Sequence, residues 1–306
     1  MKKLSFKMNS MTKLLHEKLE TLDIVKVAGA YDAMSAKIVE KHGFDAIWAG
    51  GFGITATRAL PDASIMTMTE FLEASKNMVE RCNIPVISDC DTGYGGPLNV
   101  AYMVKKFESS GIAAICIEDK RFPKQNSLFY EGNQDLISKQ NFMEKLLAAK
   151  NAKKDPNFMI IARTEALIAG LGINEAIQRA EAYEEAGADA IFIHSKKNTP
   201  DEIFNFSKKW KGNIPLVIVP TAYPSVTLNE LISNKIKIVV YAHQTVLAAY
   251  AAITDIVKEL SVAQSLNDVK SKMASMYDIF KLQELDKIRD EEKNIQSKLK
   301  NIGHNT

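Results

Sequence analysis

Residues 110–120 read Ser-Gly-Ile-Ala-Ala-Ile-Cys-Ile-Glu-Asp-Lys, and they contain the repeating unit that decides the fold. Gly111 stands where a helix should end, because glycine adopts the left-handed C-terminal conformation at little cost. The apolar run 113–117 that follows has the length and composition of a buried strand. Glu118 and Asp119 come next, at the expected end of that strand.

Apolar runs of this kind occur eight times along the chain. The apolar runs that we predict to be strands are 24–28, 46–49, 85–89, 113–117, 158–162, 190–194, 215–220 and 236–241. Segments of helical period lie between them, including 33–41, 69–81, 98–109, 139–152, 174–186 and 201–210. Apolar strands that alternate with helices predict a parallel sheet covered on both faces. Eight units favour an α/β fold closed into a (β/α)8 barrel of the TIM type over an open, doubly wound sheet.

The open sheet is also disfavoured by the absence of nucleotide-binding motifs from the sequence. No Gly-x-Gly-x-x-Gly follows the first predicted strand, and no P-loop lysine motif is present.

Composition and charge exclude several classes of function. Of the 306 residues, 46% are hydrophobic and 25% are charged, as in ordinary globular proteins. The formal net charge of +2 gives no reason to expect a nucleic acid or a membrane surface as a partner. Cys82, Cys90 and Cys116 have neither CxxC spacing nor an even count, which predicts reduced thiols. The sequence has no signal-peptide pattern and no stretch of transmembrane length, so we expect a cytoplasmic protein.

The alternation of strands and helices stops after about residue 260. We therefore expect a catalytic barrel over residues 1–260 and a helical extension over residues 261–306. Within the extension, residues 266–300 predict one or two polar helices with an apolar stripe formed by Leu285, Ile288, Ile295 and Leu299. Such a helix needs a surface to cover, which is a neighbouring subunit or its own barrel. A solvated charged tail is the third possibility.

Charged side chains gather where the predicted strands end. They are Asp89, Asp91, Glu118, Asp119, Arg163, Glu165 and His194. In a barrel these ends converge on one mouth, where enzymes of this fold perform their chemistry. Asp89 and Asp91 are two residues apart, so both should point to one side of an extended chain. Facing carboxylates repel one another unless a cation lies among them, and oxygen ligands of this kind suit Mg²⁺, with Mn²⁺ as a substitute.

Most of these residues also have a purely structural interpretation. Asp91 begins an Asp-Thr-Gly sequence that is typical of turns. Glu118 or Asp119 can form an ion pair with a base such as Arg163, and His194 can begin a helix. Arg163 is hardest to interpret in this way, because an arginine that ends an apolar strand requires anionic partners. Polar groups at four strand ends together indicate a functional site.

Over residues 20–260 the chain resembles the phosphoenolpyruvate mutase and phosphonopyruvate hydrolase branch of the isocitrate lyase superfamily. The motifs that carry the resemblance are Trp48-Ala-Gly-Gly-Phe, Pro61-Asp, Asp89-Cys-Asp-Thr-Gly-Tyr-Gly, Glu118-Asp-Lys-Arg-Phe-Pro-Lys-Gln-Asn-Ser, Ala162-Arg-Thr-Glu-Ala-Leu-Ile-Ala-Gly, Gly187-Ala-Asp-Ala-Ile-Phe-Ile-His-Ser-Lys and Val219-Pro-Thr. The resemblance implies a barrel whose C-terminal helix is exchanged between subunits of a homodimer or homotetramer. It also implies a small phosphonate or enol phosphate as the substrate.

The resemblance implies roles for twelve residues. The Mg²⁺ ligands would be Asp89, Asp91 and Glu118, directly or through water. Substrate would be bound by Trp48 and by the backbone around Gly51 and Phe52, with Arg163 and His194 neutralising the phosphoryl group. Asp62 would lie beside the migrating phosphorus, and Lys124, Asn126 and Ser127 would belong to a loop that closes over the substrate.

Two activities fit these motifs. Segments such as Thr199-Pro-Asp-Glu-Ile, Val219-Pro-Thr-Ala-Tyr-Pro and Leu282-Gln-Glu are more similar to the hydrolase. The closing loop has Asn126 before Ser127, as mutases do, where the hydrolase usually has threonine. Because an asparagine amide can hold a phosphoryl oxygen and take the place of an attacking water, we expect the mutase, with the hydrolase as the alternative.

Two further classes of protein fit the sequence less well. Carbon–carbon lyases of the superfamily carry a Lys-x-Cys-Gly-His loop, whereas this chain reads Lys124-Gln-Asn-Ser. A non-catalytic scaffold would not need the acids and bases at the strand ends.

Some positions of the chain depart from the family pattern. Gly50 replaces a serine and Gly96 an asparagine, His243-Gln244 replaces an Asn-His pair, and Leu247 replaces an arginine. These departures bear on substrate choice.

Overall fold

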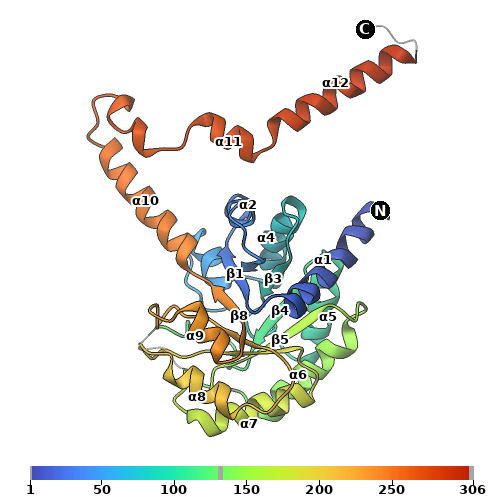
Figure 1. Ribbon diagram of the computed structural model, residues 1–306, viewed down its shortest axis with the longest axis vertical. Coiled ribbons are helices and arrows are strands. Elements are labelled where there is room, and N and C mark those ends of the chain that lie inside the picture. Colours follow the sequence, from blue (N-terminus) through green and yellow to red (C-terminus); the bar gives the residue numbers. More distant parts are fainter. Residues whose placement is uncertain (1, 130–133, 303–306) are drawn as a thin grey trace. The chain divides into compact units, whose positions relative to one another are not determined.

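The computed structural model describes residues 2–129 and 134–302 of the chain (Figure 1). Eight parallel strands form a closed barrel in sequence order, with β8 paired to β1. The strands are β1 Val25–Ala30, β2 Ala46–Ala49, β3 Val86–Asp89, β4 Ala114–Glu118, β5 Met159–Thr164, β6 Ala190–Ile193, β7 Leu216–Ile218 and β8 Ile236–Tyr241. The predicted TIM-type barrel is confirmed, and each predicted strand ends within two residues of the observed one.

Helices follow the strands as the sequence predicts. The predicted helices are α2 Ala33–Lys41, α4 Met68–Arg81, α5 Pro97–Ser109, α6 Lys139–Ala152, α7 Gly172–Glu185 and α8 Asp201–Lys209. The described chain also contains α1 Lys2–Thr21, α3 Gly51–Ala56, α9 Leu228–Ser233 and α10 Gln244–Leu260, which were not predicted. The α1 helix covers the amino-terminal end of the barrel, because Leu15 is fully buried in the cluster that fills the interior and His16 Nε2 lies 3.1 Å from the carbonyl oxygen of Asn157.

Alternation along the strands decides which side chains enter the barrel. In β4, Ala114 and Cys116 belong to the interior cluster, whereas Ile115 and Ile117 pack outward against the helices. Because successive residues of a strand point to opposite faces, the next inward position of β4 is Glu118. The same alternation applies to three other strands. Their next inward positions are Asp89 on β3, Arg163 on β5 and His194 just after β6. The fold therefore directs these four side chains to one mouth.

The chain closes the barrel tightly between its first and last strands. Val25 of β1 pairs with Ile238 of β8, and Ala28 pairs with Tyr241. A Cβ atom at Gly29 would lie 2.1 Å from the carbonyl oxygen of Ala242, so this position admits only glycine.

After β8 the chain is helical. Besides α10 it forms short 3₁₀ helices at Leu266–Asp268 and Lys270–Lys272, then α11 Met276–Leu282 and α12 Leu285–Asn301. The chain divides into two compact units, Met1–Leu247 and Ala248–Thr306. The apolar stripe of α12, from Leu285 to Leu299, is 38–60% exposed. In the part of the chain that the structure describes, no helix has both the length and the apolar character needed to span a membrane.

Asp119 points outward from β4 and ties the barrel to α7. Its Oδ2 oxygen accepts hydrogen bonds from Arg179 Nη1 at 3.0 Å and from the Tyr183 hydroxyl at 2.7 Å. Its Oδ1 oxygen accepts from the backbone N–H of Glu165 at 2.9 Å. The structural interpretation of Asp119 as an ion-pair partner thus applies, but its partner is Arg179 instead of Arg163, because Asp119 has the outward parity.

Replacing this buried carboxylate should destabilise the fold. We expect Asp119→Ala to lower the free energy of unfolding by about 3 kcal/mol, because it removes the carboxylate that accepts from both a buried guanidinium and a buried hydroxyl. Urea denaturation followed by circular dichroism measures the change. Glu80→Ala, which breaks the exposed pair of Glu80 with Lys76, is the control and should change stability by less than about 0.5 kcal/mol. Equal effects of the two substitutions would show that the Asp119 network does not stabilise the barrel.

Candidate active site

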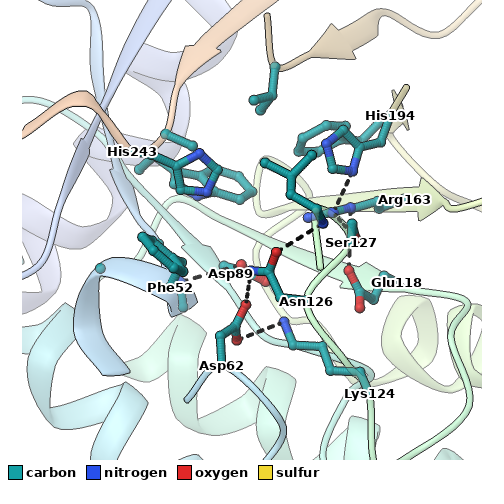
Figure 2. A pocket seen from close by; sticks show the side chains of 18 of the residues that line it. Phe52, Asp62, Asp89, Glu118, Lys124, Asn126, Ser127, Arg163, His194 and His243 are labelled. Atoms are coloured by element: carbon teal, nitrogen blue, oxygen red, sulfur yellow. Dashed lines mark hydrogen bonds and ion pairs between the residues drawn. The ribbon is translucent and has the colours of Figure 1, made fainter. Parts of the chain in front are cut away.

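A small cavity of about 40 Å³ lies at the carboxyl ends of the strands. Eleven of the twelve predicted site residues line it; the twelfth, Asp91, does not, and its Oδ2 oxygen lies 3.8 Å from Lys124 Nζ. Figure 2 shows acidic, basic and amide side chains converging on this cavity from separate elements. An enclosed space of this size suits a ligand of few atoms with many polar groups.

Asp89 and Glu118 form the acidic wall of the cavity. They are 8% and 2% exposed. Glu118 Oε1 is buried and has no hydrogen-bond partner among the described residues. Burial raises the pKa of Glu118 to about 7, although Lys124 and Arg163 act in the opposite direction. A buried carboxylate oxygen without a donor is the kind of group that a cation satisfies.

Asp91 does not lie on an extended chain, and that part of the prediction is wrong. Strand β3 ends at Asp89, and Asp91 has a left-handed backbone with φ of 56°, so it belongs to a turn. Its two carboxylate oxygens both accept from the Ser64 hydroxyl at 3.1 Å. Burial raises the pKa of Asp91, as do Asp89 and Asp62, while Lys124 lowers it. Asp91 is therefore a buried carboxylate near the cavity that does not line it.

The donor set fits Mg²⁺ better than a softer metal. Within residues 2–129 and 134–302, no three acidic, histidine or cysteine side chains form a ready-made metal cluster. Mg²⁺ does not require one, because it usually keeps several waters and takes one or two carboxylates. Asp89 and Glu118 would provide these, with Asp91 acting through water.

The balance of charge around the cavity also favours a divalent cation. The five carboxylates in or beside the cavity are Asp62, Asp89, Asp91, Glu118 and Glu165, and the three cationic side chains are Lys120, Lys124 and Arg163. With every carboxylate ionised, the cluster carries two more negative charges than positive ones. A buried excess of this kind is costly unless a cation balances it.

Arg163 forms the cationic wall. Its Nε lies 3.3 Å from Glu118 Oε2 and donates a short hydrogen bond to Glu165. Its Nη2 lies 2.8 Å from His194 Nδ1, and the guanidinium carbon sits 5.0 Å from the centre of the Phe192 ring. Burial opposes the charge, but Glu165 and Glu118 hold the pKa of Arg163 above its ordinary value. Arg163 is thus a permanent cation that faces the cavity.

His194 is next to Arg163 but carries no permanent charge. Burial lowers its pKa below the ordinary value, and the neighbouring Arg163 acts in the same direction, while Glu165 opposes both. In the described state His194 is therefore mainly neutral at pH 7 and offers a hydrogen bond. The positive charge on this wall comes from Arg163.

A loop after β4 covers the cavity, and we call residues 121–129 the lid segment. Asn126 Nδ2 donates to Asp62 Oδ2 at 2.9 Å. Lys124 Nζ lies 3.3 Å from Asp62 Oδ1 and 3.8 Å from Asp91 Oδ2. Burial opposes ionisation of Asp62, but Lys124 and Asn126 hold its pKa below the ordinary value. Figure 2 shows Lys124 and Asn126 reaching Asp62 from this one loop, so the lid segment is closed.

The remaining wall is built by β2 and the start of α3. The Gly51 N–H points toward Asp89 Oδ2 at 3.4 Å. The first amides of a helix have no partner within the helix, so those of Gly51 and Phe52 can face an anion. A Cβ atom at Gly50 would lie 2.8 Å from the ring of Trp48, so a residue with a side chain does not fit here while Trp48 keeps this position.

His243 belongs to the same wall, although the sequence gives it no role. Its ring makes an edge-to-face contact with Phe52 at 5.0 Å, and its Nδ1 lies 3.2 Å from Thr221 Oγ1. Burial lowers the pKa of His243 to about 4, so it is neutral. Phe52 and His243 also border a neighbouring, mainly apolar cavity of about 600 Å³.

Two further charged residues belong to the site, and the sequence places only one of them, Glu165, at a strand end of the predicted mouth. Lys120 is 1% exposed and Glu165 is fully buried, and both contact Ser127. Glu165 has the inward parity of β5, which is a signal that sequence reasoning can use. Lys120 follows β4 in an irregular segment, so periodicity gives no indication of where its side chain points.

Comparison with known proteins agrees with this geometry. The family described as phosphoenolpyruvate phosphomutase matches residues 12–261. The chain is 41% identical to the phosphonopyruvate hydrolase of Variovorax sp. (strain Pal2) over 276 residues, which cover 90% of this chain and 95% of that protein. It is 38% identical to the phosphoenolpyruvate phosphomutase of Tetrahymena pyriformis over 288 residues, covering 94% and 96% of the two chains.

Among solved structures, too, both a phosphomutase and a phosphonopyruvate hydrolase are similar to this chain. The phosphoenolpyruvate phosphomutase of Streptomyces platensis subsp. rosaceus has a TM-score of 0.91 at 41% identity, over 92% of this chain and 98% of that one. A phosphonopyruvate hydrolase in complex with oxalate and Mg²⁺ has a TM-score of 0.87 at 40% identity, over 92% and 97% of the chains.

The barrel, the carboxylates at its mouth and the closing loop thus occur in a chain that these enzymes match over nearly its whole length. The protein is an enzyme of the phosphoenolpyruvate mutase family, in the branch of the isocitrate lyase superfamily that contains both the mutases and the phosphonopyruvate hydrolases.

Proposed function

We propose that the protein is a phosphoenolpyruvate phosphomutase, which interconverts phosphoenolpyruvate and 3-phosphonopyruvate. In this reaction phosphorus leaves the enol oxygen and bonds to C3 of the same three-carbon skeleton, so no atom is gained or lost. The observation that carries the proposal is the position of Asn126, whose amide reaches Asp62 across the cavity. An amide in this place occupies space that an attacking water needs.

The charges around the cavity support phosphoryl transfer. The transition state is loose and metaphosphate-like, so catalysis depends on positioning and charge neutralisation. Arg163 would neutralise the phosphoryl oxygens, and neutral His194 would donate a hydrogen bond to them. The amides of Gly51 and Phe52, beside Trp48, would receive the carboxylate of the substrate. Asp62, kept ionised by Lys124 and Asn126, would face the phosphorus.

Exclusion of water supports the same assignment. The lid segment leaves a cavity of only about 40 Å³, which is space for a few waters at most. A mutase must keep water from the phosphoryl group, because hydrolysis would release phosphate and pyruvate. When bound beside Asp89 and Glu118, Mg²⁺ would supply the positive charge that stabilises the negative charge developing on the pyruvate unit.

Phosphonopyruvate hydrolase is the second candidate. It is favoured by the 41% identity to the Variovorax enzyme, which is as high as the identity to the Streptomyces platensis phosphomutase structure. In that reaction the C–P bond breaks, the oxygen of water bonds to phosphorus, and a proton is added to C3 of pyruvate. The same walls would serve both reactions, and only the access of water to phosphorus would differ.

Phosphorus NMR distinguishes the two candidates. With 3-phosphonopyruvate and Mg²⁺ we expect the phosphoenolpyruvate resonance to appear; inorganic phosphate released with pyruvate would instead establish the hydrolase. EDTA in excess should stop the conversion, and Mg²⁺ or Mn²⁺ should restore it. Asp62→Ala is the control for contaminating enzymes and should reduce the rate by about 10²–10⁴-fold while the circular dichroism spectrum stays unchanged.

The identity of residue 126 should set how much phosphate is released. In Asn126→Thr the shorter side chain no longer reaches Asp62, and water gains access to phosphorus. We expect the fraction of substrate released as phosphate to rise several-fold, and the rate of phosphoenolpyruvate formation to fall by about tenfold or more because a hydrogen bond to a charged group is lost. Asn126→Asp is a matched variant of equal size, and it should lower both rates by placing a second carboxylate against Asp62. An unchanged product ratio in Asn126→Thr would rule out the water-exclusion role.

We also propose that the C-terminal helices pack on a second copy of the chain. Tyr250, Ile253 and Val257 lie three or four residues apart on α10 and are 57–73% exposed. In the described part of α10 no residue is fully buried. A helix with an exposed apolar face is stabilised mainly by packing that face, and the stripe on α12 has the same requirement.

Light scattering tests this assembly. The full chain should have a mass that is two or four times 34.0 kDa. A chain that ends at residue 260 loses the α12 stripe and should assemble less completely or not at all. As a control, replacing the exposed polar residues Lys287 and Lys293 of α12 by glutamine should leave the mass unchanged. A full-length monomer would contradict the proposal.

A further inference from the structure

The hydroxyl of Ser127 has its full hydrogen-bonding capacity engaged within the protein. It donates to Glu165 Oε2 at 2.6 Å, and it accepts from Lys120 Nζ at 2.7 Å and from Arg163 Nη2 at 3.1 Å. A serine hydroxyl has one proton and two lone pairs, so no proton remains for a phosphoryl oxygen. In this arrangement Ser127 fastens the lid segment to the barrel.

Lys120 supports this fastening point from within the protein. Its side chain is 1% exposed. Nζ donates to Ser127 Oγ and to the backbone carbonyl oxygen of Gln125, both at 2.7 Å, and lies 3.6 Å from Glu165 Oε2. Two of its three partners belong to the lid segment, and the third belongs to the barrel. One ammonium group therefore connects the two.

Glu165 links this connection to the cationic wall. It is fully buried, accepts a short hydrogen bond from Arg163 Nε and lies 3.1 Å from His194 Nδ1. The carboxylate that receives the lid segment is thus the one that orients Arg163 and His194. A group of charges buried together in this way is stable only while each member keeps its partners.

We propose that Lys120 is a positioning residue whose ammonium group, through Ser127 and Glu165, latches the lid segment in the closed position over Arg163 and His194. Lys120 does not touch the substrate. It couples closure of the loop to the side chains that would receive the phosphoryl group, and Asn126 and Lys124 reach Asp62 only while the latch holds. The catalytic consequence rests on the proposed function, whereas the latch itself rests on the contacts alone.

A latch and an ordinary buried lysine predict different local effects. A lysine that only stabilises the fold would change the stability of the whole unit when it is removed. A latch controls local opening, which amide hydrogen exchange reports segment by segment. Suitable reporters within the lid segment are the amides of Lys124, Leu128 and Phe129, which donate to Ser64 Oγ, Asn126 Oδ1 and the Asn126 carbonyl oxygen.

The experiment compares hydrogen exchange in the full-length wild type, Lys120→Met and a matched control, Lys153→Met. Lys153 also donates to one backbone carbonyl oxygen, that of Phe158 at 2.8 Å, and to one carboxylate, that of Asp189 at 3.0 Å, but at the amino-terminal end of the barrel. We expect the lid-segment amides to exchange about tenfold faster or more in Lys120→Met, which corresponds to the loss of one charged hydrogen bond. Amides of β4 and β5 should be unchanged, and Lys153→Met should leave the lid segment as in the wild type.

The outcomes separate a latch from a lysine that only stabilises the fold. Unchanged exchange in the lid segment of Lys120→Met, or equal acceleration throughout the barrel, would overturn the proposal. If Lys120→Met does not fold, Ser127→Ala removes the fastening point alone and must accelerate the same amides. In turnover, Lys120→Met should lower kcat and raise the fraction of phosphate among the products. A protein that proves to be a hydrolase would change the second readout but not hydrogen exchange, so failure of the proposed function is distinguishable from failure of the latch.

Discussion

The buried guanidinium of Arg163 is the charge around which the site is built. It lies over the Phe192 ring and is held by carboxylates from the ends of β4 and β5. A cation in this position is tolerated only because the closed barrel brings Glu118 into register with it. The same guanidinium bonds the lid segment through Ser127 and sets the position of His194. The partners that this one charge requires thus connect the strands, the lid segment and the cationic wall.

Much of this arrangement could be predicted from the sequence because two regular periods govern it. The strand period places Asp89, Glu118, Arg163 and His194 at one mouth, and the recurring strand–helix unit predicts the closed barrel. Prediction failed where the backbone leaves these periods. Asp91 lies in a left-handed turn instead of an extended chain. Lys120 follows the end of a strand, where no periodicity indicates the direction of its side chain.

The choice between mutase and hydrolase is difficult for a related physical reason. Both reactions require a cation site, a neutralised phosphoryl group and a held carboxylate, so both preserve the same charged residues. The difference concerns whether one water reaches phosphorus, and we propose that a few side chains of the lid segment decide this. Overall similarity, which is divided between the two activities, therefore carries less weight than the contact of Asn126 with Asp62.

Closure of the barrel through β1 and β8 also affects how the protein is made. Val25 of β1 cannot pair with β8 until Ile238 has been synthesised, which is more than two hundred residues later. At ordinary rates of translation this delay is roughly 10–40 s. Throughout that interval the edge of β1 is unpaired and able to bind other extended chains. In newly synthesised protein that edge must therefore be covered by a chaperone or by another part of the chain until the last strand has emerged.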